Sequence, residues 1–247
     1  MELSKTRLNL YASLGSAKMR RRHGLFVVEG YKCISDTLKG YTLESLVVQK
    51  GCGSNMAQFG CPVYEAAPEH MQKISNLSAH SDMIGIFRLK ECGADVDLKV
   101  SEGLYVVLDG VQDPGNLGTI VRTCHWFGIF RIFASKDTVD IFNPKTVQAT
   151  MGSIGSVDVT YCNLHELFDA NRDMPVYGTM LEGEDVFATK LSKRGFIVMG
   201  NEGKGIRNDI KSCITKPLFI PPAASDHSES LNVSIATAII ISQIVKP

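Results

Sequence analysis

The stretch of residues 104–130 constrains the fold of this chain more than any other part of the sequence. It opens with an apolar run at residues 104–108, whose length suits a buried strand. Turn-forming residues 109–115 follow, and Asn116 can cap a helix that starts there. The apolar residues after it recur at helical spacing: Leu117, Ile120, Val121, Cys124 and Phe127. We therefore expect a strand, a polar loop and a helix, with Asn116 at the carboxyl end of the strand, where open α/β sheets bind ligands.

The rest of the C-terminal half continues this alternation. Pro144 and Asn163 mark the starts of two helices, and a last, very apolar helix is predicted over residues 230–245. Further strands are predicted at residues 131–134, 157–161, 176–181, 196–199 and 218–220. Helical spacing groups one face of the last helix: Leu231, Ile235, Ala238, Ile239 and Ser242. The alternation predicts a largely parallel sheet that helices cover on both faces.

The N-terminal part shows a shorter version of the same pattern. Strands are predicted at residues 24–28, 46–48, 63–64 and 83–89, with helices over 4–14, before Gly40, and over 68–76. This indicates a small α/β domain. Polar residues 90–102 separate the two patterned regions. We therefore predict an N-terminal domain at residues 1–95, a linker at 96–103 and a second domain at 104–247.

The composition argues against several classes of protein. No apolar run reaches the length of a membrane span, and the first ten residues lack the apolar stretch of a signal peptide. The seven cysteines form no CxxC pair, which favours reduced thiols over a disulfide framework or a metal site. We expect a cytoplasmic protein that binds no membrane and no metal.

Charge gives a weaker indication of the partner. The net charge is zero, so the total does not predict binding to nucleic acid. Basic residues nevertheless gather at residues 18–23, directly before a predicted strand. Arg20, Arg21 and Arg22 could contact RNA phosphates. The run alone favours a solvated charged loop, which is the commoner case for such a cluster.

Three predicted strand ends carry unusual residues. The first is the segment 109–116. The second, residues 200–206, is rich in glycine and taken alone is either a plain turn or a weak phosphate cradle, since it matches neither common phosphate-loop spacing. The third, residues 221–234, leads into the last helix, where Ser230 is a natural cap. Capping by Ser230 leaves Asn232, inside the first turn, without an explanation.

Taken together, these three segments resemble the motifs of the SpoU (TrmH-like) class of SPOUT RNA methyltransferases. Residues 116–122 match the first motif, 200–203 the second and 230–234 the third. Residues 20–30 are similar to the substrate-binding domain that often precedes the class, which itself resembles a ribosomal-protein RNA-binding fold. One departure is the loop 221–230, which is longer than usual and lacks the glycine that the family often has after the proline; Ala223, Ala224 and Ser225 occupy that region. His227 in this loop is more simply a solvated histidine than a catalytic one.

The resemblance implies a function and a set of site residues. It implies transfer of a methyl group from S-adenosylmethionine to a ribose 2′-hydroxyl of structured RNA, with ribosomal RNA as the first choice. It also implies a deep trefoil knot in the C-terminal domain and a homodimer whose site is completed across the interface. Cofactor-binding residues would be Gly200, Asn201, Gly203, Ile220, Pro221 and Leu231. Catalytic residues would be Asn116, Arg122, Glu202, Ser230 and Asn232.

The expected roles follow from the chemistry of the side chains. Asn116 and Asn232 would orient the ribose and the cofactor, Glu202 would fix Arg122 or another polar partner, and Ser230 would position the hydroxyl or cap the helix. Arg122 would stabilise a developing alkoxide or grip a phosphate, because a guanidinium is essentially never neutral in a protein. The alternatives are a transfer-RNA methyltransferase, a non-catalytic RNA-binding protein of the same fold, and a nucleotide-phosphate enzyme that uses residues 200–205.

Overall fold

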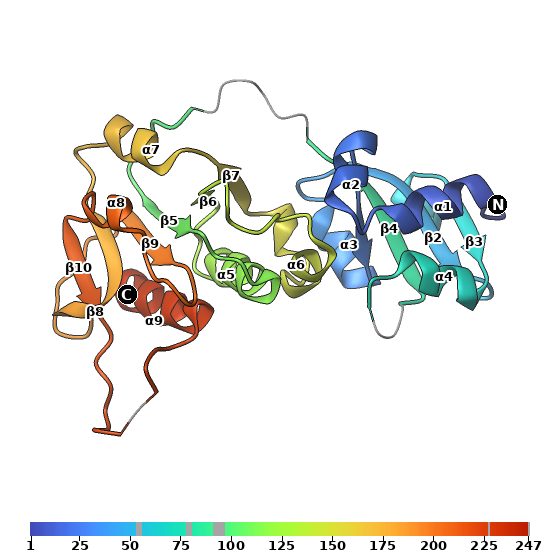
Figure 1. The fold of residues 1–247 in the computed structure, drawn as a ribbon. Coiled ribbons are helices and arrows are strands. Elements are labelled where there is room, and N and C mark those ends of the chain that lie inside the picture. Colours follow the sequence, from blue (N-terminus) through green and yellow to red (C-terminus); the bar gives the residue numbers. More distant parts are fainter. Residues whose placement is uncertain (53–55, 78–80, 91–96, 227, 247) are drawn as a thin grey trace. The chain divides into compact units, whose positions relative to one another are not determined.

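The computed structural model describes residues 1–52, 56–77, 81–90, 97–226 and 228–246 (Figure 1). The chain forms two compact units. The first comprises Met1–Cys92 together with Asp140–Ser156, and the second comprises Gly93–Val139 together with Val157–Pro247. Val96 of the predicted linker and His227 lie outside the described residues.

The first unit is an α/β domain built on a four-stranded sheet. Its strands are β1 (Leu25–Glu29), β2 (Leu43–Gln49), β3 (Val63–Ala66) and β4 (Met83–Arg88), in the order β1-β4-β2-β3. Its helices are α1 (Lys5–Ser13), α2 (Ala17–His23), α3 (Tyr31–Thr37) and α4 (Pro68–Ile74), with a 3-10 turn at Met56–Phe59. Leu8 and Met71, from α1 and α4, are buried in one core cluster with the sheet residues Val47 and Ile84.

A segment from the C-terminal half of the sequence also packs in the first unit. It carries α6 (Pro144–Ala149) and a 3-10 turn at Ser153–Gly155. The ring of Phe142 lies 4.9 Å from the ring of Phe26 on β1, measured between centroids. Gly155 approaches α3 so closely that a Cβ there would lie 2.3 Å from the carbonyl oxygen of Asp36. Only glycine permits this approach, so the turn is fixed against α3.

The second unit contains the predicted parallel sheet. Its six strands are β5 (Leu104–Asp109), β6 (Arg131–Ala134), β7 (Asp158–Tyr161), β8 (Val176–Asp185), β9 (Gly195–Gly200) and β10 (Lys216–Phe219). They lie in the order β10-β8-β9-β5-β6-β7, and every neighbouring pair is parallel. The prediction of an α/β fold with a parallel sheet and a separate N-terminal domain is confirmed.

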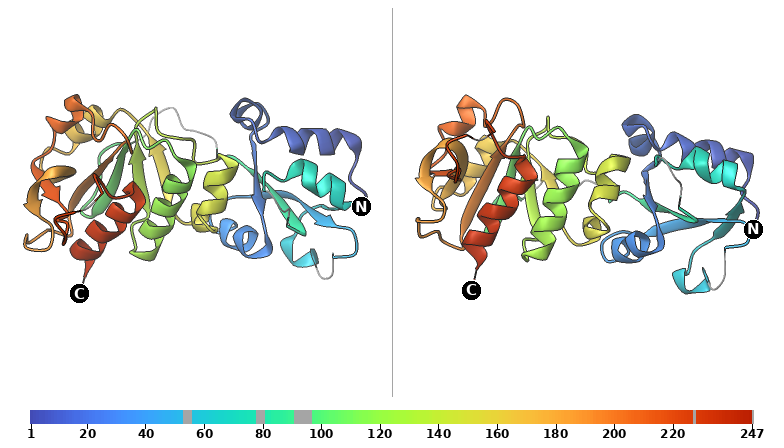
Figure 2. Two further views of the ribbon diagram at one scale, coloured as in Figure 1. Left: turned by 60° about the horizontal axis from the view of Figure 1, so that its bottom comes forward. Right: turned by 90° about the horizontal axis from the view of Figure 1, so that it is seen from below.

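Helices lie on the sheet of the second unit as a doubly covered fold requires. They are α5 (Pro114–Trp126), α7 (Leu164–Ala170), α8 (Asn208–Lys211) and α9 (Val233–Val245). Leu167 of α7 and Ile210 of α8 share a buried cluster with Val107 and Val198 of the sheet. Helices α5 and α9 contact each other and lie side by side in both views of Figure 2.

Two predicted helix caps were wrong. Helix α5 begins at Pro114 and is capped by Asp113, whose Oδ1 accepts a hydrogen bond from the backbone N–H of Asn116 at 2.8 Å. Proline suits the first helical turn because its φ is already helical and it has no N–H to satisfy. Helix α9 begins at Val233 and is capped by Asn232 rather than Ser230.

The face of α9 that helical spacing groups together is the more exposed side of the helix. Ile235 is 51 % exposed, whereas the buried side of the helix carries Thr237, Ile240, Ile241 and Ile244. A helix that is apolar on nearly every side gives no periodic signal for the face that packs inward. In the described part of the chain, no helix has both the length and the apolar character needed to cross a membrane.

Candidate functional site

The loops that follow β5 and β9 meet at one edge of the sheet. The two strands are hydrogen-bonded neighbours, and their last residues, Asp109 and Gly200, are paired in register. The third segment reaches the same place through α9, which packs beside α5. The carboxyl ends of parallel strands share one edge, so this is where the fold gathers the three sequence segments.

A chain of side-chain hydrogen bonds joins the three segments. Glu202 Oε1 accepts from Asn116 Nδ2 at 3.0 Å and from the backbone N–H of Asp113 at 3.2 Å, and its Oε2 accepts from the backbone N–H of Gln112 at 3.2 Å. Asn116 Oδ1 in turn accepts from Asn232 Nδ2 at 2.9 Å. Hydrogen bonds therefore join three of the five predicted catalytic residues, with Asn116 between Glu202 and Asn232.

Two further features fix the charge of Glu202 and the orientation of the Asn232 amide in this chain of hydrogen bonds. Burial acts to raise the pKa of Glu202, but the hydrogen bonds from Asn116 and from backbone N–H groups outweigh it and hold the pKa below its usual range. Glu202 is thus an anion that accepts only. Asn232 Oδ1 accepts from the backbone N–H of Ser234 at 2.9 Å, which leaves its amide group to donate to Asn116.

The glycine-rich loop after β9 is closed by its own hydrogen bonds. Asn201 exchanges backbone hydrogen bonds with Gly205, and its Oδ1 accepts from the N–H groups of Gly203 and Lys204, both at 3.0 Å. A Cβ at Gly200 would lie 2.3 Å from the carbonyl carbon of Gly205. The tight loop therefore needs glycine at that position. Because the two N–H groups are already bound, the loop is a poor phosphate cradle, which argues against a nucleotide-phosphate enzyme.

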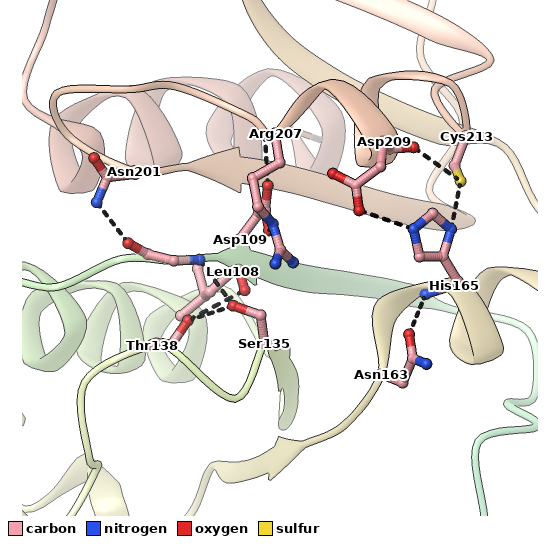
Figure 3. Close-up of polar contacts among 11 residues, drawn as sticks. Leu108, Asp109, Ser135, Thr138, Asn163, His165, Asn201, Arg207, Asp209 and Cys213 are labelled. Carbon is pink, nitrogen blue, oxygen red and sulfur yellow. Dashed lines mark hydrogen bonds and ion pairs between the residues drawn. The ribbon is translucent and has the colours of Figure 1, made fainter.

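A buried ion pair beneath this loop was missed by the sequence analysis (Figure 3). The Asp109 side chain is fully buried, and its carboxylate accepts from the Arg207 backbone N–H at 2.8 Å and from Nε at 2.7 Å. Arg207 Nη2 lies 2.7 Å from the same carboxylate. A buried carboxylate needs such compensation, so the pair ties the end of the loop to β5. The available sequence signal was an aspartate that ends an apolar strand.

The structure does not bring Arg122 and Ser230 into the hydrogen-bond chain. Arg122 is exposed on α5, and its side chain makes no hydrogen bond or ion pair with the described residues. Six residues separate it from Asn116, which turns the two side chains to different sides of the helix. Ser230 and Leu231 are exposed, with Leu231 at 48 %, while Ile220 and Pro221 are half-buried.

Of the three arginines predicted to contact RNA, one is buried and two are exposed. Arg20 is only 3 % exposed, and its Nη1 donates to the carbonyl oxygens of Leu14 at 3.0 Å and Gly15 at 2.9 Å. Its Nη2 forms an ion pair with Asp140 at 2.6 Å. Its side chain therefore holds the first unit together and does not face solvent, as an RNA contact would require. Arg21 and Arg22, on the same helix, are exposed.

Among the side chains that the structure describes, no group of three or more His, Cys, Asp and Glu is arranged to hold a metal ion.

Comparison with known proteins places this geometry in a family. The sequence profile of the SpoU rRNA Methylase family matches residues 103–242, and that of the MRM3-like substrate binding domain matches residues 6–85. The chain is 27 % identical over 236 residues to the 23S rRNA (guanosine(2553)-2′-O)-methyltransferase RlmP of Bacillus subtilis, covering 94 % of this chain and 92 % of that protein.

Solved structures agree with the sequence match. An RNA methyltransferase of the TrmH family from Porphyromonas gingivalis superposes with a TM-score of 0.85 at 34 % identity, over 98 % of both chains. An AdoMet-bound rRNA methyltransferase from Sinorhizobium meliloti gives a TM-score of 0.85 at 29 % identity, over 98 % of this chain and 96 % of that one. This chain belongs to the SpoU rRNA Methylase family.

Proposed function

We propose that this chain transfers a methyl group from S-adenosylmethionine to a ribose 2′-hydroxyl of ribosomal RNA. The observation that carries the proposal is the hydrogen-bond chain Glu202–Asn116–Asn232, which joins three separated segments in a member of the SpoU family. The similar Bacillus protein is named for 2′-O-methylation of 23S rRNA, and the similar Sinorhizobium structure holds AdoMet.

The residues around the three loops suit the methyl donor. The tight turn at Gly200 fixes the backbone of the second loop, Leu231 in the third segment offers an exposed apolar side chain, and Ile220 and Pro221 are half-buried. These residues would hold the adenosine and methionine parts, with Asn201 and Gly203 keeping the loop closed. When bound, S-adenosylmethionine supplies a methyl group already activated by a sulfonium, so no metal is needed.

The protein must position the ribose and stabilise charge on its oxygen. Asn116 and Asn232 are held in place by Glu202 and by the start of α9, which fixes their polar atoms before substrate binds. Arg122 would stabilise the developing alkoxide, since its guanidinium keeps its charge. The first unit would bind RNA, and its exposed Arg21 and Arg22 would contact phosphates.

The position of Arg122 supports the proposal of a homodimer. It shares an exposed side of α5 with Trp126, which is 85 % exposed, and Ile235 on the neighbouring α9 is 51 % exposed. Large apolar side chains on a surface favour a partner. We propose that a second copy covers this face and that Arg122 of each copy completes the site of the other. A knot in the C-terminal unit, implied by the family, is part of the same proposal, and a crystal structure traced through residues 195–245 tests it.

Mixed dimers test the shared site. Arg122→Ala and Asn232→Ala chains, each inactive alone, are co-expressed with different affinity tags. Random pairing makes half of the dimers mixed, and each mixed dimer holds one intact site, so activity recovers to about a quarter of the wild-type value. If mixed dimers form and activity does not recover, Arg122 acts in the site of its own chain.

Methyl transfer itself is tested with ribosomal RNA from cells that lack the gene. Purified protein and tritium-labelled S-adenosylmethionine are added, and the RNA is hydrolysed with alkali. A methylated 2′-oxygen blocks cleavage at the next phosphate, so the label appears in an alkali-stable dinucleotide. Label in mononucleotides would mean methylation of a base, and binding of RNA without label would support the non-catalytic alternative. Transfer RNA, assayed in parallel, tests the other substrate.

A further inference from the structure

A second cluster of reactive side chains lies in the second unit, outside the residues assigned to the methyl-transfer site. It consists of His165, Asp209 and Cys213 (Figure 3). His165 stands in the first turn of α7, where Asn163 Oδ1 accepts from its backbone N–H at 3.0 Å. Asp209 belongs to α8, and Cys213 follows that helix, with its backbone N–H bound to the Ile210 carbonyl at 3.0 Å. Asp209 and Cys213, the two neighbours of the imidazole, are thus both positioned by α8.

The imidazole bridges the carboxylate and the thiol. His165 Nε2 lies 3.0 Å from Asp209 Oδ2, and His165 Nδ1 lies 3.7 Å from Cys213 Sγ. The hydrogen bond from His165 is the largest of the effects that hold the pKa of Asp209 below its usual range. Because a carboxylate only accepts, the Nε2 atom of a neutral His165 must carry the proton. The other nitrogen, Nδ1, then presents its lone pair to the thiol, as the base of a nucleophilic pair does.

We propose that Cys213 is a nucleophilic modification site that reacts with small disulfides. The Cys213 thiol gives its proton to His165 Nδ1, and Asp209 stabilises the imidazolium that results. The Cys213 sulfur attacks one sulfur of the disulfide, so that a new S–S bond forms as the old one breaks. The departing thiolate takes the proton from His165, and the products are a mixed disulfide on Cys213 and one free small thiol.

The surroundings of the other described cysteines set Cys213 apart. Burial raises the pKa of the thiols of Cys33, Cys61 and Cys124, and it raises that of Cys162 to about 11. Cys52 is exposed, and its sulfur has no histidine or carboxylate partner among the described residues. Cys213 is partly exposed and has a base beside it. The side chains of His165 and Asp209 are themselves 45 % and 56 % exposed.

Cys52 serves as the internal reference for the test. Full-length protein is treated with iodoacetamide at pH 7, and the rate of labelling at each cysteine is followed by mass spectrometry. An ordinary thiol with a pKa of about 8.5 is ionised to about 3 % at this pH, so complete activation raises the rate about 30-fold at most. We expect Cys213 to react at least about tenfold faster than Cys52. A rate at or below that of Cys52 overturns the proposal.

Variants separate activation by His165 from simple exposure. His165→Asn should lower the rate at Cys213 to that of Cys52 or below and leave the rate at Cys52 unchanged, which also reports an intact fold. Asp209→Asn should act in the same direction and replaces the first variant if that chain does not fold. His70→Asn, in the first unit, is the matched control and should change nothing. An unchanged Cys213 rate in folded His165→Asn protein, or no mixed disulfide with glutathione disulfide, refutes the assignment.

Discussion

Replacing Arg207 by alanine tests whether the buried ion pair anchors the glycine-rich loop. The substitution leaves the Asp109 carboxylate fully buried with one remaining contact, the backbone N–H at 2.8 Å. Removing one partner of a buried pair costs about 3–5 kcal/mol of folding free energy. The Arg207 side chain is 47 % exposed, and solvent screening therefore favours the lower end, about 3 kcal/mol.

The partner substitution should cost less. Asp109→Asn keeps an acceptor for Arg207 and removes the buried charge, and the loss of a charge-assisted hydrogen bond costs about 1–2 kcal/mol. The double variant leaves no charge unpaired, so its cost should fall short of the sum of the two by about 1–3 kcal/mol. The comparison isolates the pair from the general effect of shortening a side chain.

Unfolding by urea, followed through the fluorescence of Trp126, is the assay. Trp126 is the sole tryptophan and belongs to the second unit, so its signal follows that unit and the dimer interface proposed above. All variants are therefore compared at one protein concentration. Arg172→Ala is the control, because its ion pair with Asp169 is exposed at 77 % and 66 % and should contribute less than about 1 kcal/mol. Equal losses in the Arg207 and Arg172 variants, or strictly additive losses in the cycle, would refute the anchoring role.

Four other substitutions test the account. Arg122→Ala should lower methyl transfer about 10²–10³-fold with cofactor binding by calorimetry unchanged, and near-normal turnover would remove Arg122 from the mechanism. Because hydrogen bonds lower the pKa of Glu202, wild-type protein should be more stable than Glu202→Gln above about pH 4.3 and lose that advantage as the pH falls further; a pH-independent difference in urea unfolding would contradict this. Arg20→Ala should destabilise the first unit by about 3–5 kcal/mol, whereas Arg21→Ala should leave it stable within about 0.5 kcal/mol and weaken RNA binding in filter assays; the reverse pattern would contradict the burial argument.

The sequence was sufficient for the architecture because apolar runs and turn residues are local signals. The strand at Leu104–Asp109 was predicted to within one residue, whereas the helix after it begins at Pro114 and not after Asn116. The caps failed because Asp113 and Asn116 both suit a cap, and only the path of the chain decides between them. Asn232 was the more instructive failure: it caps α9 with its Oδ1 and still donates to Asn116.

Long-range features lay beyond the reach of the sequence. Asp109 and Arg207 are 98 residues apart, and nothing local to either predicts the pair. Arg20 is similar, since a basic run normally faces water and its burial depends on Asp140, 120 residues away. The packing of Asp140–Ser156 in the first unit is of the same kind. Each of these is decided by which elements become neighbours in the fold.

A crystal of this protein soaked with S-adenosylmethionine tests the central claim most directly. The account predicts density for the methyl donor against the backbone of Gly200 and the side chain of Leu231, with its methyl group directed toward the side of the loops where Asn116 and Asn232 meet. Density remote from these residues, or a loop 200–205 that binds a nucleotide phosphate and no sulfonium, would contradict it.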